Sequence, residues 1–352
     1  MKVVVDKGIK SIQEIISLLN GFDAVELIFF SSSDIKNSNI KDADVLLVRS
    51  TVKVDELLLA GTNIKLIGSA TSGIDHIDTY YLKKNYIKWF YAPGCNASSV
   101  VNYVMSSICF LKDKGIFDST SSVGIIGYGN IGKKLKKALD YFSIENLIYD
   151  PFLNFEYLVD IEQIKNCNLI TLHVPMTYKT EFPTYNMIDK FFLDNIQGKT
   201  LINTSRGGVV DESELIKLRN INYISDVWTD EPCPSNEVIE YALLATPHVA
   251  GHSTNGKING TIMLIDFLQN HIEINNDQKK LNLEIMKNFI TSKDAVKEVE
   301  SKVHIDNYNQ EYDIKLESDS FKKKYIKSIT TNKKNTFEDA RSKHLIRKDI
   351  EI

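Results

Sequence analysis

Three ionisable residues stand in an order that suits acid–base chemistry on a substrate with a carboxylate: Arg206, Glu231 and His248. Each follows a short apolar run typical of a buried strand, and an open α/β sheet binds its ligands beyond the carboxyl ends of its strands. The planar fork of an arginine matches a carboxylate. An imidazole, with an ordinary pKa of about 6.5, can accept and return a proton near neutral pH. We therefore predict Arg206, Glu231 and His248 to be catalytic.

A glycine-rich segment ahead of these residues predicts a dinucleotide site. Residues 121–132, SSVGIIGYGNIG, are a short apolar strand followed by a glycine turn and a helix start. Gly127 permits the tight turn, Gly129 lets the backbone approach a pyrophosphate, and Gly132 lets the helix pack closely on the strand. The free N–H groups of the helix N-terminus would then bind the phosphates. A bare pattern of this kind can be only a turn, so its surroundings matter.

Asp150 strengthens the dinucleotide interpretation. It ends a second predicted strand and falls about 18 residues after Gly132, where the fingerprint has an acid for the ribose hydroxyls. Residues 151–156 contain no Arg or Lys that could bind a 2′-phosphate, so we predict NAD rather than NADP as the cofactor.

Taken singly, each of the three catalytic candidates has a structural explanation, because a loop arginine, a loop glutamate and a histidine after proline are all common in proteins. Their order behind this motif favours a catalytic role.

Length and composition limit the classes of protein that this chain can belong to. A chain of 352 residues predicts two or three domains. The formal net charge of -4 argues against a nucleic-acid partner, and no apolar run has transmembrane length. The four cysteines show neither paired nor metal-ligand spacing, which predicts no metal site and suits a reducing cytoplasm. Each cysteine is better explained as a small core residue than as a nucleophile.

The elements that must position these residues follow an α/β rhythm. Strand-like and helical stretches alternate before the glycine motif, so they predict a domain of their own, and a long apolar helix over 97–114 leads into the nucleotide half. We predict two Rossmann-like domains, a discontinuous substrate domain and an NAD-binding domain, with a small C-terminal dimerisation domain. The expected ranges are 1–96 for the first part of the substrate domain, 97–255 for the NAD-binding domain, 256–280 for a helix that returns to the substrate domain, and 281–352 for the dimerisation domain.

The C-terminal range leaves two interpretations open. Beyond about residue 276 the chain is rich in Lys, Glu, Asp and Asn, with sparser apolar positions. It can be a small domain that buries its limited apolar face against a partner subunit, or a largely solvated tail. Recurring apolar positions such as Phe289, Tyr312, Ile314 and Phe321 favour folding.

The chain resembles the D-2-hydroxyacid dehydrogenase family. The resemblance covers roughly residues 1 to 275 and rests on four blocks in the family's order: Gly127-x-Gly129-x-x-Gly132, Ser205-Arg206-Gly207-Gly208, Glu231-Pro232 and Thr246-Pro247-His248. Segments 48–54, 70–76 and 92–97 resemble family members that oxidise 4-phospho-D-erythronate on the way to pyridoxal 5′-phosphate. The segment Phe337–Arg341 is similar to a C-terminal extension that such members use to form homodimers.

That resemblance implies a set of site residues. For the cofactor these are Gly127, Tyr128, Gly129, Asn130, Ile131, Gly132, Asp150, Val174, Thr204, Ser205, Arg206, Asp226 and Gly251; for the substrate they are Ser50, Thr71 and His252. Three positions depart from the family pattern. Val174 replaces a Thr, so only its backbone could serve, and Asn102 replaces a frequent Glu. His252 replaces a substrate-binding Tyr, and its protonated form could pair with a phosphate.

The resemblance implies a reaction as well: NAD-dependent oxidation of the C2 hydroxyl of 4-phospho-D-erythronate to the 2-oxo acid. Arg206 would hold the carboxylate, His248 would take the hydroxyl proton, and Glu231 would orient the imidazole. A nearer alternative is another D-2-hydroxyacid, such as phosphoglycerate, glyoxylate or hydroxypyruvate. A different class of function is a non-catalytic NAD sensor, but a sensor needs only the glycines and Asp150, so the catalytic set argues against it.

Overall fold

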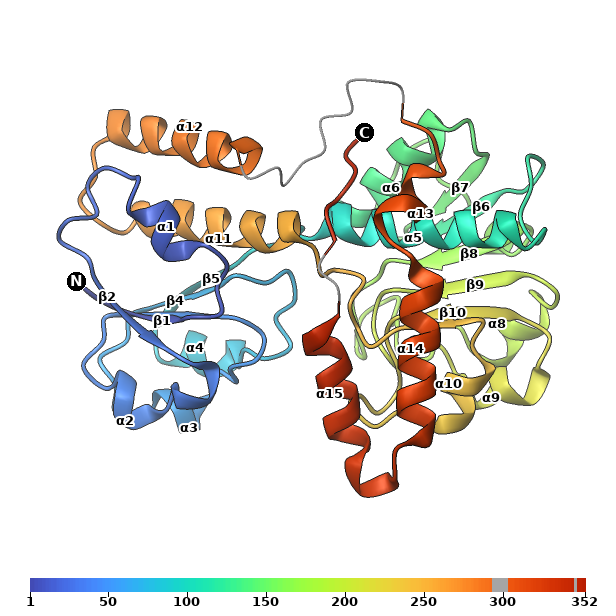
Figure 1. Cartoon of the computed structure of the whole chain (residues 1–352), viewed down its shortest axis with the longest axis horizontal. Helices are drawn as coiled ribbons and strands as arrows, with labels where there is room; N and C mark the ends of the chain where they lie inside the picture. Colours follow the sequence, from blue (N-terminus) through green and yellow to red (C-terminus); the bar gives the residue numbers. More distant parts are fainter. Residues whose placement is uncertain (293–302, 345–346) are drawn as a thin grey trace. The chain divides into compact units, whose positions relative to one another are not determined.

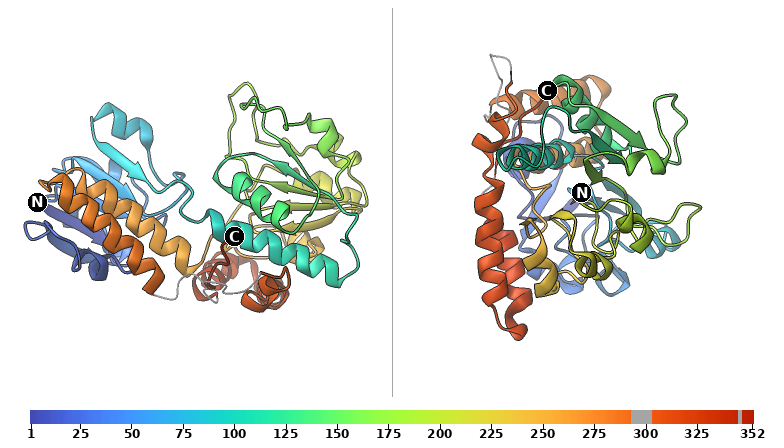
Figure 2. Two further views of the ribbon diagram at one scale, coloured as in Figure 1. Left: turned by 90° about the horizontal axis from the view of Figure 1, so that it is seen from above. Right: turned by 90° about the vertical axis from the view of Figure 1, so that its right-hand side faces the viewer.

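The computed structural model describes residues 1–292, 303–344 and 347–352. The chain forms two compact units, and each is built from two stretches of sequence. Unit 1 contains residues 1–96 and 253–292, and unit 2 contains residues 97–252 and the described residues from 303 onward. Figures 1 and 2 show both units as helices packed on a sheet. The predicted α/β class is confirmed.

Unit 1 contains a five-stranded parallel sheet. Its strands are short and rich in Val, Leu, Ile and Phe, as expected where a parallel sheet is covered on both faces. In hydrogen-bonded order they are β2 (Glu26–Phe30), β1 (Lys2–Asp6), β3 (Val45–Val48), β4 (Leu66–Ser69) and β5 (Lys88–Tyr91). All four pairings are parallel.

Helices cover both faces of this sheet (Figure 1). One apolar core lies under α1 (Ile12–Ile16), α11 (Thr254–Gln269) and α12 (Asn276–Ser292). The other lies under α2 (Asn37–Ile40), α3 (Glu56–Leu59) and α4 (Thr79–Lys84). The carboxylates of Asp55 and Asp78 cap α3 and α4 by accepting backbone N–H groups. A short 3-10 helix, η1 (Ser32–Asp34), follows β2.

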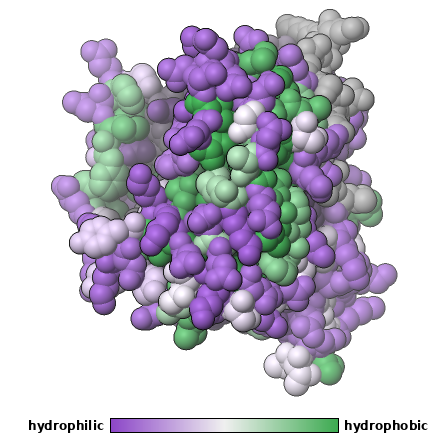
Figure 3. Space-filling model, turned by 90° about the vertical axis from the view of Figure 1, so that its left-hand side faces the viewer, coloured by the Kyte–Doolittle hydropathy of each residue, from purple (hydrophilic) through white to green (hydrophobic). Residues whose placement is uncertain are grey.

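Strand β2 was not among the predicted elements. Its sequence ELIFF is a short continuous apolar run, and such a run fits a strand or a buried helix equally well. It is the edge strand of the sheet, where Leu27, Ile28, Phe29 and Phe30 are only partly buried. Figure 3, viewed from the left-hand side of Figure 1, shows hydrophobic residues gathered between hydrophilic ones on the surface.

Unit 2 contains a six-stranded parallel sheet whose strand order reverses at the first strand. In hydrogen-bonded order the strands are β11 (Leu244–Ala245), β10 (Asn222–Ser225), β9 (Thr200–Asn203), β8 (Leu169–Leu172), β6 (Val123–Ile126) and β7 (Asn146–Tyr149). β6 therefore lies between β8 and β7, and the glycine motif follows β6 at the switch point of the sheet. Open α/β sheets bind ligands at such a point.

Two apolar cores hold the helices of unit 2 to its sheet. One includes α5 (Ala97–Asp113), α6 (Asn130–Tyr141) and α13 (Asn307–Glu311). The other includes α7 (Ile161–Ile164), α8 (Lys190–Asp194), α9 (Glu212–Leu218), α10 (Asn236–Tyr241), α14 (Ile314–Lys327) and α15 (Lys333–Lys343). A 3-10 turn, η2 (Thr330–Asn332), joins the last two helices, which lie side by side (Figure 2).

The residues predicted to form one C-terminal domain contribute to both units. Helix α12 packs on α11 in unit 1, where Phe289 is buried. In unit 2, Tyr312 and Ile314 belong to one core and Phe321 to the other. Residues 293–302 and 345–346 of the predicted domain lie outside the described part. Its role in dimerisation stays a prediction. Over the described residues, no helix combines the length and the apolarity that a membrane span needs.

Candidate active site

The glycine turn after β6 has a separate geometric reason for each of its three glycines. Gly127 has φ +98°, and a Cβ there would lie 2.5 Å from the carbonyl oxygen of His173. A Cβ on Gly132 would lie 2.2 Å from the carbonyl oxygen of Gly127, so the helix could not pack as closely. A Cβ on Gly129 would meet no atom within 4 Å. The backbone at Gly129 therefore borders open space that a pyrophosphate can enter.

The start of α6 adds anion-binding groups to this turn. Gly129 is the N-cap and supplies no side-chain cap, so the N–H groups from Asn130 and Ile131 onward have no side-chain partner at the cap. They and the positive end of the helix dipole suit a phosphate. Asp150 follows β7, and its carboxylate accepts the N–H of Tyr128 at 2.9 Å. These residues fit a dinucleotide, with the phosphates at the helix N-terminus and the ribose hydroxyls at Asp150.

We expect Asp150→Asn to narrow the preference for NAD over NADP. The carboxylate repels a 2′-phosphate, so its neutralisation should lower the ratio of the two kcat/KM values by about ten- to a hundredfold. The measurement is steady-state kinetics with each cofactor. Glu156→Gln, which neutralises an exposed carboxylate on the same loop, is the matched control and should leave the ratio unchanged. A wild-type protein that already uses NADP as well as NAD would contradict the assignment.

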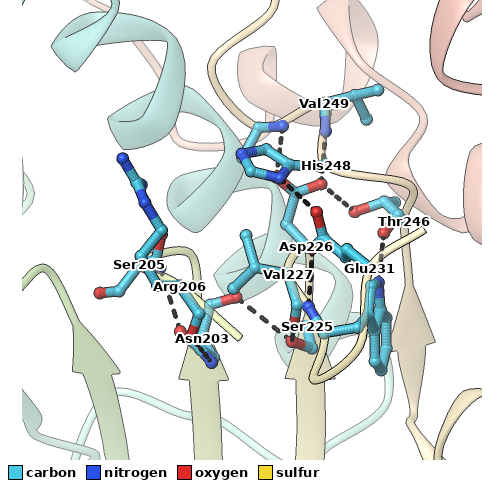
Figure 4. Close-up of polar contacts among 12 residues, drawn as sticks. Asn203, Ser205, Arg206, Ser225, Asp226, Val227, Glu231, Thr246, His248 and Val249 are labelled. Carbon is cyan, nitrogen blue, oxygen red and sulfur yellow. Dashed lines mark hydrogen bonds and ion pairs between the residues drawn. The ribbon is translucent and has the colours of Figure 1, made fainter. Parts of the chain in front are cut away.

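The three predicted catalytic residues follow three neighbouring strands. Arg206 follows β9, Glu231 follows β10 and His248 follows β11, so the parallel sheet brings them to one edge. Nδ1 of His248 lies 2.7 Å from Oε2 of Glu231. Figure 4 shows the His248 ring and the Arg206 side chain beyond the strand ends on the same side. Because a carboxylate only accepts, Nδ1 carries the hydrogen in this pair, and Nε2 is left to accept a proton.

Glu231 is held in its charged form. Burial by itself raises the pKa of this carboxyl, but the charge and hydrogen bond of His248, the N–H of Trp228 and the charge of Arg341 together hold the pKa below its usual range. The Trp228 N–H donates to Oε1 at 2.8 Å. The ionised carboxylate orients the imidazole of His248 through the contact with Nδ1.

The loop that carries His248 depends on Asp226. The residue is 1 % exposed, and its carboxylate accepts the N–H groups of Val249 at 2.7 Å and Ala250 at 2.8 Å and the hydroxyl of Thr246 at 2.6 Å. The backbone of His248 has φ +59°, a left-handed conformation that few non-glycine residues adopt. Asp226 therefore fixes a strained loop, and its predicted place along the NAD site stays a prediction.

The Arg206 loop packs directly against the Glu231 loop. A Cβ on Gly207 would lie 1.8 Å from the carbonyl oxygen of Trp228, so only glycine permits this approach. Asn203, the last residue of β9, shapes the same turn: its side chain accepts the N–H of Ser205 at 3.0 Å and donates to the carbonyl of Arg206 at 3.1 Å. The sequence block around Arg206 thus sets the distance between the arginine and the His248–Glu231 pair.

Glu212, at the start of α9, lies beside the site and was not predicted from the sequence. Its side chain accepts the N–H of Thr229 at 3.1 Å, in the loop that carries Glu231, and the hydroxyl of Tyr223 at 3.4 Å. Only 8 % of the residue is exposed. Burial raises the pKa of Glu212 to about 7, and the charge of Glu231 acts in the same direction. An acidic residue after the helix cap Asp211 is an ordinary helix start, so no sequence signal marks it.

The raised pKa of Glu212 predicts a stability that falls with pH. Between about pH 4.5 and about pH 7 the Glu212 carboxyl keeps its proton in the folded protein but loses it in the unfolded chain. The free energy of unfolding therefore falls as pH rises through this window, by roughly 3 kcal/mol in total. Glu212→Gln removes this titration. Urea unfolding at several pH values across this window should therefore show that the free energy of unfolding of Glu212→Gln increases relative to that of the wild type as pH rises. A constant difference between the two proteins would contradict the assignment.

The remaining predicted residues divide between the units. In unit 2, the Ser205 hydroxyl accepts the N–H of Val174 at 3.0 Å, so Val174 can offer a cofactor only its carbonyl. Thr204 is buried, and the His252 ring lies 4.9 Å from the ring of His344. The other two predicted substrate residues belong to unit 1.

In unit 1, Ser50 is exposed in the turn after β3. The Thr71 hydroxyl lies 2.8 Å from that of Ser69 and donates to the carbonyl of Gly73. The roles of Ser50, Thr71, His252, Thr204, Tyr128 and Gly251 stay predictions.

The fold and site define a class of protein, and comparison with a protein-family model agrees. Residues 114–250 match the model of the NAD binding domain of D-isomer specific 2-hydroxyacid dehydrogenases. The structure also resembles NAD+-bound 3-phosphoglycerate dehydrogenase of Entamoeba histolytica, with a TM-score of 0.62 and 27% identity over 77% of this chain and 96% of that one. The chain is an NAD-dependent dehydrogenase.

Curated relatives place the chain more closely. It is 34% identical over 353 residues to the erythronate-4-phosphate dehydrogenase of Ruthia magnifica subsp. Calyptogena magnifica, covering 99% of this chain and 96% of the relative. It is 40% identical over 282 residues to the enzyme of the same name from Wigglesworthia glossinidia brevipalpis, covering 77% and 73%. The chain belongs to the D-isomer specific 2-hydroxyacid dehydrogenase family, in the branch of these two relatives.

Proposed function

We propose that this protein oxidises 4-phospho-D-erythronate at C2 to the 2-oxo acid, with reduction of NAD+ to NADH and release of one proton, as a step of pyridoxal 5′-phosphate biosynthesis. The observation that carries the oxidation is the His248–Glu231 pair, at the same sheet edge as Arg206 and next to a cradle for a dinucleotide. The names of the curated relatives support the choice of substrate.

The proposed roles follow from the chemistry of each side chain. Arg206 binds the substrate carboxylate with its fork of donors and places C2 and its hydroxyl near His248. Nε2 of His248 takes the hydroxyl proton, and the charged carboxylate of Glu231 at 2.7 Å stabilises the imidazolium that forms. Bound NAD+ supplies the acceptor for the hydride that leaves C2.

A substrate panel tests the proposal. NADH formation is followed with 4-phospho-D-erythronate, D-3-phosphoglycerate, D-glycerate and D-lactate. We expect the highest kcat/KM with 4-phospho-D-erythronate and a large loss when the phosphate is absent. A preference for an unphosphorylated acid would refute the substrate assignment while leaving the dehydrogenase class intact.

A second candidate substrate, a shorter phosphorylated 2-hydroxy acid, rests on His252. His252 stands where the family pattern has a substrate-binding Tyr, and its ring lies against that of His344. An imidazole differs from a phenol in reach and charge, so the pocket for the end of the substrate distant from C2 can differ as well. The panel separates this alternative, because a shorter phosphorylated acid such as 3-phosphoglycerate would then give the highest kcat/KM.

The proposal includes a homodimer in the cytoplasm. The homodimer is supported by two exposed apolar side chains in the C-terminal part of unit 2, Leu316 of α14 at 61% exposed and Ile329 of the following turn at 71% exposed. The free cysteines suit a reducing compartment. We expect a dimer by light scattering and a monomer for the double variant Leu316→Glu, Ile329→Glu. Leu57→Glu, at a position 85% exposed in unit 1, is the control and should stay dimeric. A monomeric wild type would contradict this part of the proposal.

A further inference from the structure

The last described segment, residues 347–352, is bound to unit 2 by its own polar contacts (Figure 1). The Asn102 side chain on α5 donates to the carbonyl of Ile350 at 2.9 Å and accepts its N–H at 2.7 Å. The Asp349 carboxylate accepts the hydroxyl of Ser99 at 2.9 Å. Asn102, which departs from the family pattern, therefore ties the start of the first long helix of unit 2 to this segment.

Arg347 reaches from this segment to the loop after His248. It is 4 % exposed, and its guanidinium lies 4.3 Å over the ring of Tyr312. Nη1 donates to the carbonyl of Val249 at 3.2 Å, while Nη2 donates to the carbonyls of Ala250 and Ser99, the latter at 3.1 Å. A single side chain thus binds two consecutive carbonyl groups that follow His248 directly.

The same two residues are bound from the other side by Asp226. Its carboxylate accepts the N–H groups of Val249 and Ala250, as Figure 4 shows for Val249. The N–H groups of the loop therefore bind a buried anion and its carbonyl groups bind a buried cation. A strained loop needs such fixed partners, because its left-handed backbone at His248 is not the conformation that the residue adopts by itself.

We propose that Arg347 is a positioning residue for the reaction: by binding the carbonyls of Val249 and Ala250 opposite Asp226, it holds the loop that places the His248 imidazole. The segment 347–352 is then part of the framework of the active site. The inference rests on the proposed role of His248, and it adds a residue far from the catalytic blocks in sequence. Small displacements of a catalytic group are costly, since about 1 Å can lower the rate by about a hundredfold.

The test compares Arg347→Met and Arg347→Lys with Lys348→Met, which removes a charge from the exposed neighbouring position. For Arg347→Met we expect kcat to fall by about ten- to a hundredfold with the dissociation constant of NAD unchanged. Arg347→Lys should recover part of the rate, because it keeps the charge but loses the fork that spans two carbonyls. Lys348→Met should equal the wild type.

Hydrogen exchange measured by mass spectrometry separates positioning from general destabilisation. In Arg347→Met the peptide that spans 246–252 should exchange faster, while the peptide that spans 123–132 should not change. Because this measurement needs no substrate, it decides the inference even if the protein oxidises none of the acids in the panel. Unchanged exchange at 246–252, faster exchange throughout unit 2, or a wild-type kcat in Arg347→Met would each overturn the proposal.

Discussion

Replacement of His248 by glutamine should lower kcat for hydroxy-acid oxidation by about 10²–10⁴-fold, the usual contribution of a positioned acid–base group. Glutamine keeps a donor and an acceptor near Glu231 but cannot take the hydroxyl proton. The dissociation constant of NAD should stay close to that of the wild type, because the dinucleotide residues around Gly127 and Asp150 are untouched. Parallel turnover assays and NAD titrations measure both quantities.

His271→Gln is the matched control for this prediction. It makes the same chemical change at an exposed histidine in the turn between α11 and α12 of unit 1, where the Nδ1–H donates to the carbonyl of Phe267 at 2.9 Å. This control should retain full activity. A His248→Gln protein with nearly wild-type turnover would remove His248 from the mechanism, and with it the proposed role of Glu231.

Replacement of Arg206 by methionine should raise KM for the hydroxy acid and lower kcat/KM by about 10²–10³-fold, since truncation of one partner leaves the substrate carboxylate unpaired. Methionine keeps much of the length of the side chain without its charge. The kcat/KM of Arg206→Lys should lie between those of the wild type and Arg206→Met, because an ammonium supplies charge but no planar fork. Steady-state kinetics as a function of hydroxy-acid concentration provide the measurement.

A control variant and an inhibition measurement test the prediction for Arg206. Arg219→Met changes an arginine at the end of α9, whose side chain is 63% exposed and pairs with Glu237 of α10. This variant should leave KM unchanged. Inhibition by oxalate, a small dianion, should weaken in Arg206→Met in parallel with the rise in KM. Unchanged oxalate inhibition would mean that another residue binds the carboxylate.

The sequence predicted those parts of the fold and site that depend on local patterns. Glycine spacing located the turn after β6, and apolar runs located the strands that precede Arg206 and His248. The expected helix over 97–114 is α5, observed at Ala97–Asp113, because its apolar positions recur along a long uninterrupted stretch. Strand β2 was missed since its apolar run is too short to distinguish a strand from a helix.

The contacts that hold the site in place could not be predicted, because they join residues far apart in the chain. Asp226 binds N–H groups 23 and 24 residues further on, and Arg347 binds carbonyls 97 and 98 residues before it. Neither residue type nor spacing marks such pairs. Glu212 was missed for a related reason: its carboxylate is unusual only because of the burial that tertiary packing gives it.

The divided sequence of unit 1 has a consequence for the order in which a ribosome delivers it. Val3 and Val5 share a core with Ile258 and Leu264 of α11, and the whole first part of unit 2 is translated between them. At ordinary elongation rates these roughly 160 intervening residues take about 8–30 s. During that time this apolar face of the nascent sheet has only α1 to cover it, because α11 and α12 have not yet been made.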